Sequence, residues 1–97
     1  MGIIDKLNKD FESRVRLGIM SVLMVNDWVD FKEMKSILAI TDGNLASHSI
    51  GLERGKYIEV KKEFVGRKPK TSYRVTNFGR LAFNNHLNQL ENLLKTK

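Results

Sequence analysis

The hydrophobic pattern of this chain changes its period at Gly55, and that change limits the folds open to it. Before Gly55, apolar residues recur every three or four positions, as on one face of a helix. After it, Val60 and Phe64 alternate with charged residues, and the alternation returns around Tyr73, as on strands. A chain of 97 residues is one domain. We therefore expect a single, mostly helical α+β domain over residues 1–97.

Two helices are predicted in the N-terminal part of the chain. An apolar face at helical spacing predicts the first over residues 12–25. After a possible very short strand at 28–29, Asp30 and Glu33 form a capping-box pattern, in which each side chain accepts a backbone N–H of the other residue. This pattern predicts a second helix over 31–39. Its predicted core face consists of Phe31, Met34, Ile37 and Leu38.

A third helix is predicted directly after the second. Thr41 is a good N-cap, Asp42 places negative charge in the first turn, and the helix is expected over residues 42–54. Gly55 can adopt the left-handed backbone conformation that commonly ends a helix. Two short helices joined by so short a turn predict a helix-turn-helix over residues 31–54.

Positive charge is concentrated in the predicted hairpin at 57–75, whose loop is expected over residues 66–70. Residues 61–74 carry six basic side chains against one acidic one, which leaves +5 of the molecule's +6. Such a hairpin suits the tracking of phosphates, because each neutralised phosphate releases counterions. The alternative is a solvated edge hairpin whose lysines prevent aggregation. The six are Lys61, Lys62, Arg67, Lys68, Lys70 and Arg74, and the acidic residue is Glu63.

The last predicted helix, over residues 77–95 with Thr76 as its cap, carries leucines at the spacing of a coiled-coil seam. Leucines that extend beyond the rest of the domain need other apolar groups to cover them. A second copy of the chain would supply this cover, together with residues 1–11. The alternative is that Phe83 and Leu87 close the monomer's own core. The candidate dimer-interface residues are Phe83, Leu87, Leu90, Leu93 and Leu94.

Several stretches resemble winged helix-turn-helix transcriptional regulators of the MarR, ArsR and PadR groups, over about residues 12–92. They are residues 41–48, 52–58 and 66–69, with Tyr73, Thr76, Gly79, Arg80, Ala82 and Phe83. The resemblance implies a two-stranded hairpin wing, a long C-terminal dimerisation helix, and a homodimer that binds double-stranded DNA to regulate transcription. Two positions depart from the resembled pattern: Ser49 stands where leucine is usual, and Gly51 where a basic or polar residue is usual. Both weaken the third helix, since glycine inside a helix costs up to about 1 kcal/mol relative to alanine.

The expected DNA contacts lie on the third helix and on the wing. Asn44, Ser47 and His48 are short polar groups on what we expect to be the exposed side of the helix, suited to base edges in the major groove. The alternatives are local capping for Asn44 and an ordinary surface role for His48. Arg67 and Lys68 are expected on the DNA backbone or in the minor groove. The expected phosphate contacts, with solubility as their alternative role, are Lys61, Lys70 and Arg74, followed by Lys32, Lys35, Arg14 and Arg16.

Other functional classes find little support in the sequence. There is no cysteine, no phosphate-cradling glycine loop and no convergent set of metal ligands, so we expect no enzyme, no cofactor and no bound metal. No apolar run is long enough for a membrane span and no export signal is recognisable, so we expect a cytoplasmic protein.

Two further binding classes are alternatives to duplex DNA. Recognition of RNA is disfavoured because Phe64 and Tyr73 are expected in the core rather than as a stacking platform. The alternative from a different class is a winged helix that binds an acidic protein partner, since the fold does not fix the function.

Overall fold

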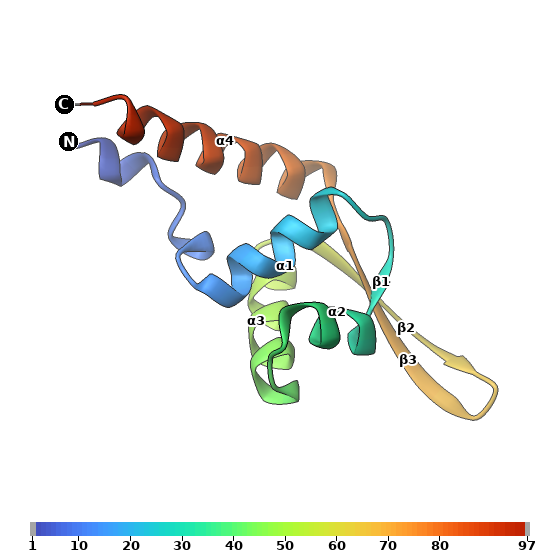
Figure 1. Ribbon diagram of the computed structural model, residues 1–97. Coiled ribbons are helices and arrows are strands. Elements are labelled where there is room, and N and C mark those ends of the chain that lie inside the picture. The colour runs from blue at the N-terminus through green and yellow to red at the C-terminus, as the bar shows by residue number, and fades with distance from the viewer. Residues whose placement is uncertain (1, 97) are drawn as a thin grey trace.

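The computed structural model describes residues 2–96, and Met1 and Lys97, the ends of the predicted domain, lie outside the described residues. Two short 3-10 turns, η1 (Ile3–Lys6) and η2 (Lys9–Phe11), precede helix α1 (Arg14–Met24). The helix was predicted from residue 12, but it begins later because the Ser13 hydroxyl accepts the N–H groups of Val15 and Arg16. Figure 1 shows η1 beside the last helix and η2 near the start of α1, so that the two ends of the chain lie close together.

The helix-turn-helix is formed by α2 (Phe31–Leu38) and α3 (Asp42–Arg54), as predicted. The capping box of Asp30 and Glu33 is present at α2, and the Thr41 side chain caps α3. The turn between them is made by Ala39, which ends α2 in the left-handed region at φ 52°. Ile37, predicted in the core face of α2, is instead 58% exposed.

The end of α3 differs from the prediction in one residue. Gly55 has φ −75° and lies in the right-handed region, whereas Lys56 takes the left-handed conformation at φ 65°. Gly55 is nevertheless tightly placed, because a Cβ there would overlap the ring of Tyr57. The glycine is therefore required for close packing and not for its freedom in φ.

The hairpin is part of a three-stranded antiparallel sheet rather than a two-stranded one. Its strands are β2 (Ile58–Val65) and β3 (Lys68–Val75), and the short β1 (Val29–Asp30) pairs with the other edge of β3. The connecting turn consists of Gly66 and Arg67 alone, with Gly66 at φ 67°. The loop predicted over 66–70 is shorter because residues 68–70 pair with residues 63–65. The wing therefore extends well beyond the helices (Figure 1).

The core lies between α1, α2, α3 and the inner part of the sheet, and α4 (Asn77–Leu94) closes it, with Thr76 as the predicted cap. Phe83 reaches this core from α4 and meets the ring of Phe11 edge-on at 5.3 Å. Among residues 2–96, no helix is sufficiently long and apolar to cross a bilayer. The largest fully buried side chains are Phe11, Ile19, Met20, Leu23, Met34, Leu45 and Leu52.

Candidate nucleic-acid interface

Helix α3 has one buried face and one free face. Leu45 and Leu52 are fully buried, as predicted, and Ser49 between them is 4% exposed. The Ser49 hydroxyl donates to the Ala46 carbonyl at 3.1 Å, so the polar group that replaces an expected leucine is satisfied inside the helix. The opposite face, which is exposed, consists of Gly43, Ser47, Ile50 and Arg54, spaced by four, three and four. Of the predicted contacts on α3, Ser47 lies on this face.

His48 does not lie on the free face of α3, where the sequence reasoning placed it. Its Nδ1 accepts a hydrogen bond from Nε of Arg16 at 3.1 Å, so the imidazole is held between α3 and α1. Gly51 lies beside it, and a Cβ at this position would overlap the Arg16 guanidinium. Gly51 thus leaves room for the arginine that joins the two helices.

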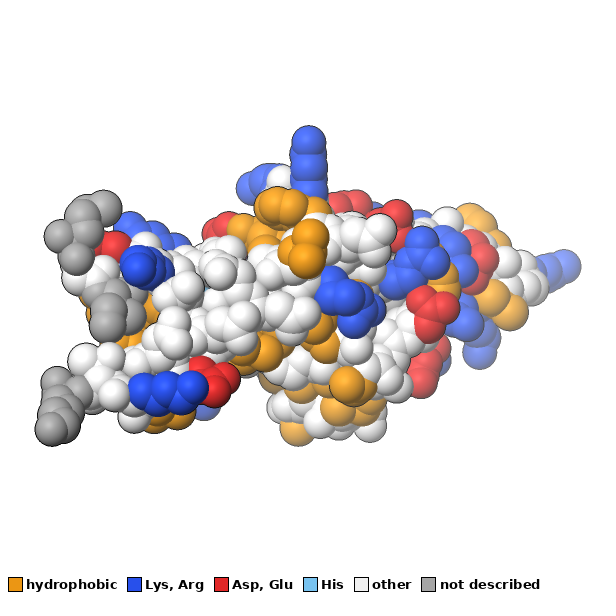
Figure 2. All heavy atoms as spheres, turned by 90° about the horizontal axis from the view of Figure 1, so that it is seen from above, with side chains coloured by type: hydrophobic (Ala, Val, Ile, Leu, Met, Phe, Trp, Pro, Cys, Tyr) orange, Lys and Arg blue, Asp and Glu red, His pale blue; other side chains and the backbone are white. Residues whose placement is uncertain are grey.

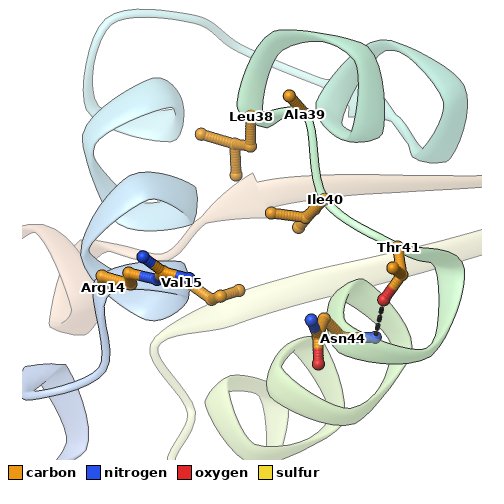
Figure 3. A pocket seen from close by; sticks show the side chains of 7 residues that line it. All are labelled: Arg14, Val15, Leu38, Ala39, Ile40, Thr41 and Asn44. Carbon is orange, nitrogen blue, oxygen red and sulfur yellow. Dashed lines mark hydrogen bonds between the residues drawn. The ribbon is translucent and has the colours of Figure 1, made fainter.

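Asn44 lies at the rim of a groove of about 430 Å³ between α1 and the start of α3. Figure 3 shows Arg14 and Val15 on the α1 side of the groove, Asn44 on the α3 side, and the apolar side chains of Leu38 and Ile40 on its third side. The Asn44 backbone N–H donates to the Thr41 hydroxyl at 3.1 Å, so the helix cap is made by Thr41. Asn44 and Arg14 thus flank the N-terminus of α3, where the helix dipole favours an anion.

The wing tip presents its basic residues to solvent. Residues 61–70 are all exposed, and they include the predicted contacts Arg67, Lys68 and Lys70. Figure 2 shows Lys and Arg side chains along the wing end of the molecule, with acidic side chains among them. This surface has the sign of charge that a phosphate backbone requires.

Two predicted phosphate contacts, Lys61 and Arg74, already have partners at the base of the wing. Arg74 donates from Nε and Nη2 to Oε2 of Glu59 at 2.9 and 2.7 Å. Its guanidinium lies 4.6 Å from the ring centre of Trp28, and Nζ of Lys61 lies 4.4 Å from the same centre. Sequence reasoning missed this cluster because only the pairing of β1 with β3 brings Trp28 beside Arg74.

Phe64 is 75% exposed, contrary to the expectation that it belongs to the core. Phe64 lies on the same face of β2 as the buried Ile58. The helices that cover this face at Ile58 do not extend as far as Phe64. Tyr73, by contrast, is 3% exposed as expected, and burial raises the pKa of its hydroxyl.

The predicted dimer seam on α4 is divided between the core and the surface. Phe83 is 2% exposed and packs in the monomer's own core, the alternative role expected for it. Leu87, Leu90 and Leu94 are 42%, 37% and 87% exposed, and Leu93 is half-buried. The η1 segment of the same chain contacts α4, so part of the cover expected from a second copy comes from within the protomer.

Comparison with known proteins agrees with this geometry. An uncharacterized protein of Methanocaldococcus jannaschii is 37% identical over 87 residues, which cover 90% of this chain and 95% of that protein. The solved structure of a transcriptional regulator homologue from Pyrococcus horikoshii superposes with a TM-score of 0.87 at 29% identity, covering 98% and 96% of the two chains. Reduced HlyU from Vibrio cholerae has the same fold, with a TM-score of 0.66 at 21% identity over 78% and 76% of the chains.

The family model of the winged helix DNA-binding domain matches residues 15–94, which include the helix-turn-helix, the wing and nearly all of α4. This chain belongs to the winged helix DNA-binding domain family.

Proposed function

We propose that the protein binds specific duplex DNA sequences as a homodimeric transcriptional regulator, with α3 in the major groove and the wing on the backbone or in the minor groove. The observation that carries this proposal is the shared surface of α3 and the wing. A groove of about 170 Å³ is lined by Ile50 on α3 and by Lys62 and Thr71 on the wing. A single polyanionic ligand can therefore contact both elements. The likeness to a transcriptional regulator homologue supports a regulatory role.

The proposed dimer would pair through α4. Leu87 and Leu94 lie seven residues apart on one flank of the helix and are both exposed, and Ile4 of η1, 70% exposed, adds apolar surface at the same end of the molecule. Burying such leucines against a second copy removes apolar area from water. A two-fold dimer predicts a palindromic site whose half-sites lie about one helical turn apart.

The experiment that tests the proposed function is selection of the purified protein against a pool of randomised duplex DNA. We expect enrichment of a palindromic sequence and tighter binding to that duplex than to a scrambled one of equal length. Equal binding to the scrambled duplex would contradict specific recognition. Failure to bind either duplex, together with binding to an acidic polypeptide such as polyglutamate, would support the alternative of a protein-interaction module instead.

A further inference from the structure

We propose that Ile50 is a specificity-determining residue, which reads the C5-methyl group of a thymine in the major groove. This inference rests on the proposed function, since it names the chemistry by which α3 selects a base. Ile50 is 50% exposed in the middle of the free face of α3, between Ser47 and Arg54. An isoleucine there leaves apolar surface in water until a partner covers it.

The chemistry of the free face favours a methyl group as that partner. Gly43 and Ser47 are small, and an added Cβ at Gly43 would meet no atom within 4 Å, so the helix can approach the base edges closely. The residues usually responsible for paired hydrogen bonds to purines are Arg, Lys, Asn and Gln, and the middle of this face contains none of them. On base edges in the major groove, the thymine methyl is the apolar group that distinguishes one pair from the others.

The surroundings of Ile50 combine apolar side chains, such as Phe31 and Val60, with a basic side chain of the wing. The groove that Ile50 lines includes Lys62 from the wing, and Glu53 lies on its α3 wall. Lys62 belongs to the run of exposed residues that carries the excess positive charge of the hairpin. Ile50 thus lies where an apolar groove meets the basic wing, which suits a surface that presents a methyl group next to phosphates.

The test is a double-mutant cycle between Ile50→Ala and replacement of thymine by deoxyuracil, which removes the C5-methyl group alone. The duplex is the one enriched by the wild-type protein in the selection described above, and each thymine is replaced in turn. We expect at least one replacement to weaken wild-type binding by about fourfold, which corresponds to the free energy gained by burying one methyl group. The same replacement should leave binding by Ile50→Ala unchanged.

Two controls make the outcome specific to Ile50. Ile50→Val keeps a branched side chain and should remain sensitive to the replacement, whereas Val25→Ala truncates an 80% exposed valine at the end of α1 and should bind like the wild type. Thermal unfolding of each variant verifies that it folds. The proposal is overturned if every replacement weakens wild type and Ile50→Ala by the same factor, or if no replacement affects the wild type. Absence of any enriched duplex would instead overturn the proposed function.

Discussion

At the scale of single residues, the start of α4 depends on the absence of a side chain at position 79. The Thr76 hydroxyl accepts the Gly79 N–H at 2.8 Å and donates to the Lys56 carbonyl at 2.7 Å, which draws the first turn of α4 onto the chain that follows α3. Because the helix and this segment lie so close together, a Cβ on Gly79 would overlap the backbone carbonyl oxygen of Tyr57. Backbone cannot move aside as a flexible side chain can.

Gly79→Ala is therefore expected to destabilise the protein although alanine is the better helix former. Overpacking of this kind costs about 1–3 kcal/mol, which exceeds the gain of up to about 1 kcal/mol in helix propensity. The matched control is Gly43→Ala, where a Cβ meets nothing within 4 Å, and which should be neutral or slightly stabilising. Urea unfolding of both variants checks this expectation, and equal stability of the two would contradict it.

Residues also show where sequence reasoning reached its limit. Caps were predictable because they depend on residues three positions apart, such as Asp30 with Glu33. The bond from Arg16 to His48 joins residues 32 positions apart, and no local pattern indicates it. His48 was therefore assigned to the free face of α3 when it packs toward α1.

At the scale of elements, the N-terminal segment is anchored to the domain by partly buried hydrogen bonds. The Asn8 backbone N–H donates to Nδ1 of His86 on α4 at 3.0 Å, which requires that nitrogen to be unprotonated. The Tyr57 hydroxyl donates to Oδ2 of Asp10 at 2.6 Å, and the Phe11 ring lies 5.5 Å from that of His86. Burial lowers the pKa of His86, an effect that the charge of Glu12 partly opposes.

The lowered pKa of His86 predicts that stability falls with pH below about 6.5, the ordinary value for histidine. As pH drops from 6.5 toward the lowered pKa, the unfolded chain binds a proton at this position that the folded protein does not, so the free energy of unfolding decreases. His86→Gln retains an acceptor but does not titrate. Urea unfolding at pH 7.5 and 5.5, at one protein concentration, should show a smaller decrease in the free energy of unfolding for the variant than for the wild type. An identical decrease in both proteins would show that His86 is not responsible for the pH dependence.

Among the elements, the four helices and the hairpin were predictable, because their periodicity and caps are local. The sequence did not predict that strand β1 joins the sheet, because β1 is only two residues long. Its partner β3 lies far away in the sequence. The exposure of Phe64 was missed for a related reason. Alternation shows which residues share a face of a strand, but not where the helices that cover that face end.

At the scale of the whole molecule, the two proposed interfaces lie at different ends of an elongated body. The protein measures 56 × 25 × 21 Å, with the wing at one end and the termini and the last turns of α4 at the other (Figure 1). Pairing through α4 would therefore leave α3 and both wings free to contact DNA.

The dimer proposal predicts that a charge in the α4 seam separates the protomers. Leu87→Glu should raise the dimer dissociation constant by about tenfold or more, because a buried carboxylate without a partner is costly. Leu81→Glu is the matched control, since Leu81 is 71% exposed and is followed at helical spacing by Asn84, Asn85 and Asn88. Light scattering over a concentration series measures both. A monomeric wild type, or equal effects of the two variants, would contradict the proposal.

The most direct test of the whole account is the salt dependence of binding to duplex DNA. The wild type is compared with Arg67→Ala/Lys68→Ala/Lys70→Ala and with Lys6→Ala/Lys9→Ala/Lys95→Ala, which removes equal charge at the opposite end of the molecule. Each phosphate contact contributes about 0.9 to the slope of log affinity against log salt. We expect the wing variant to lower the slope by about two to three units and the control to leave it unchanged. Absence of binding at low salt, or an equal fall in both variants, would contradict a DNA-binding wing.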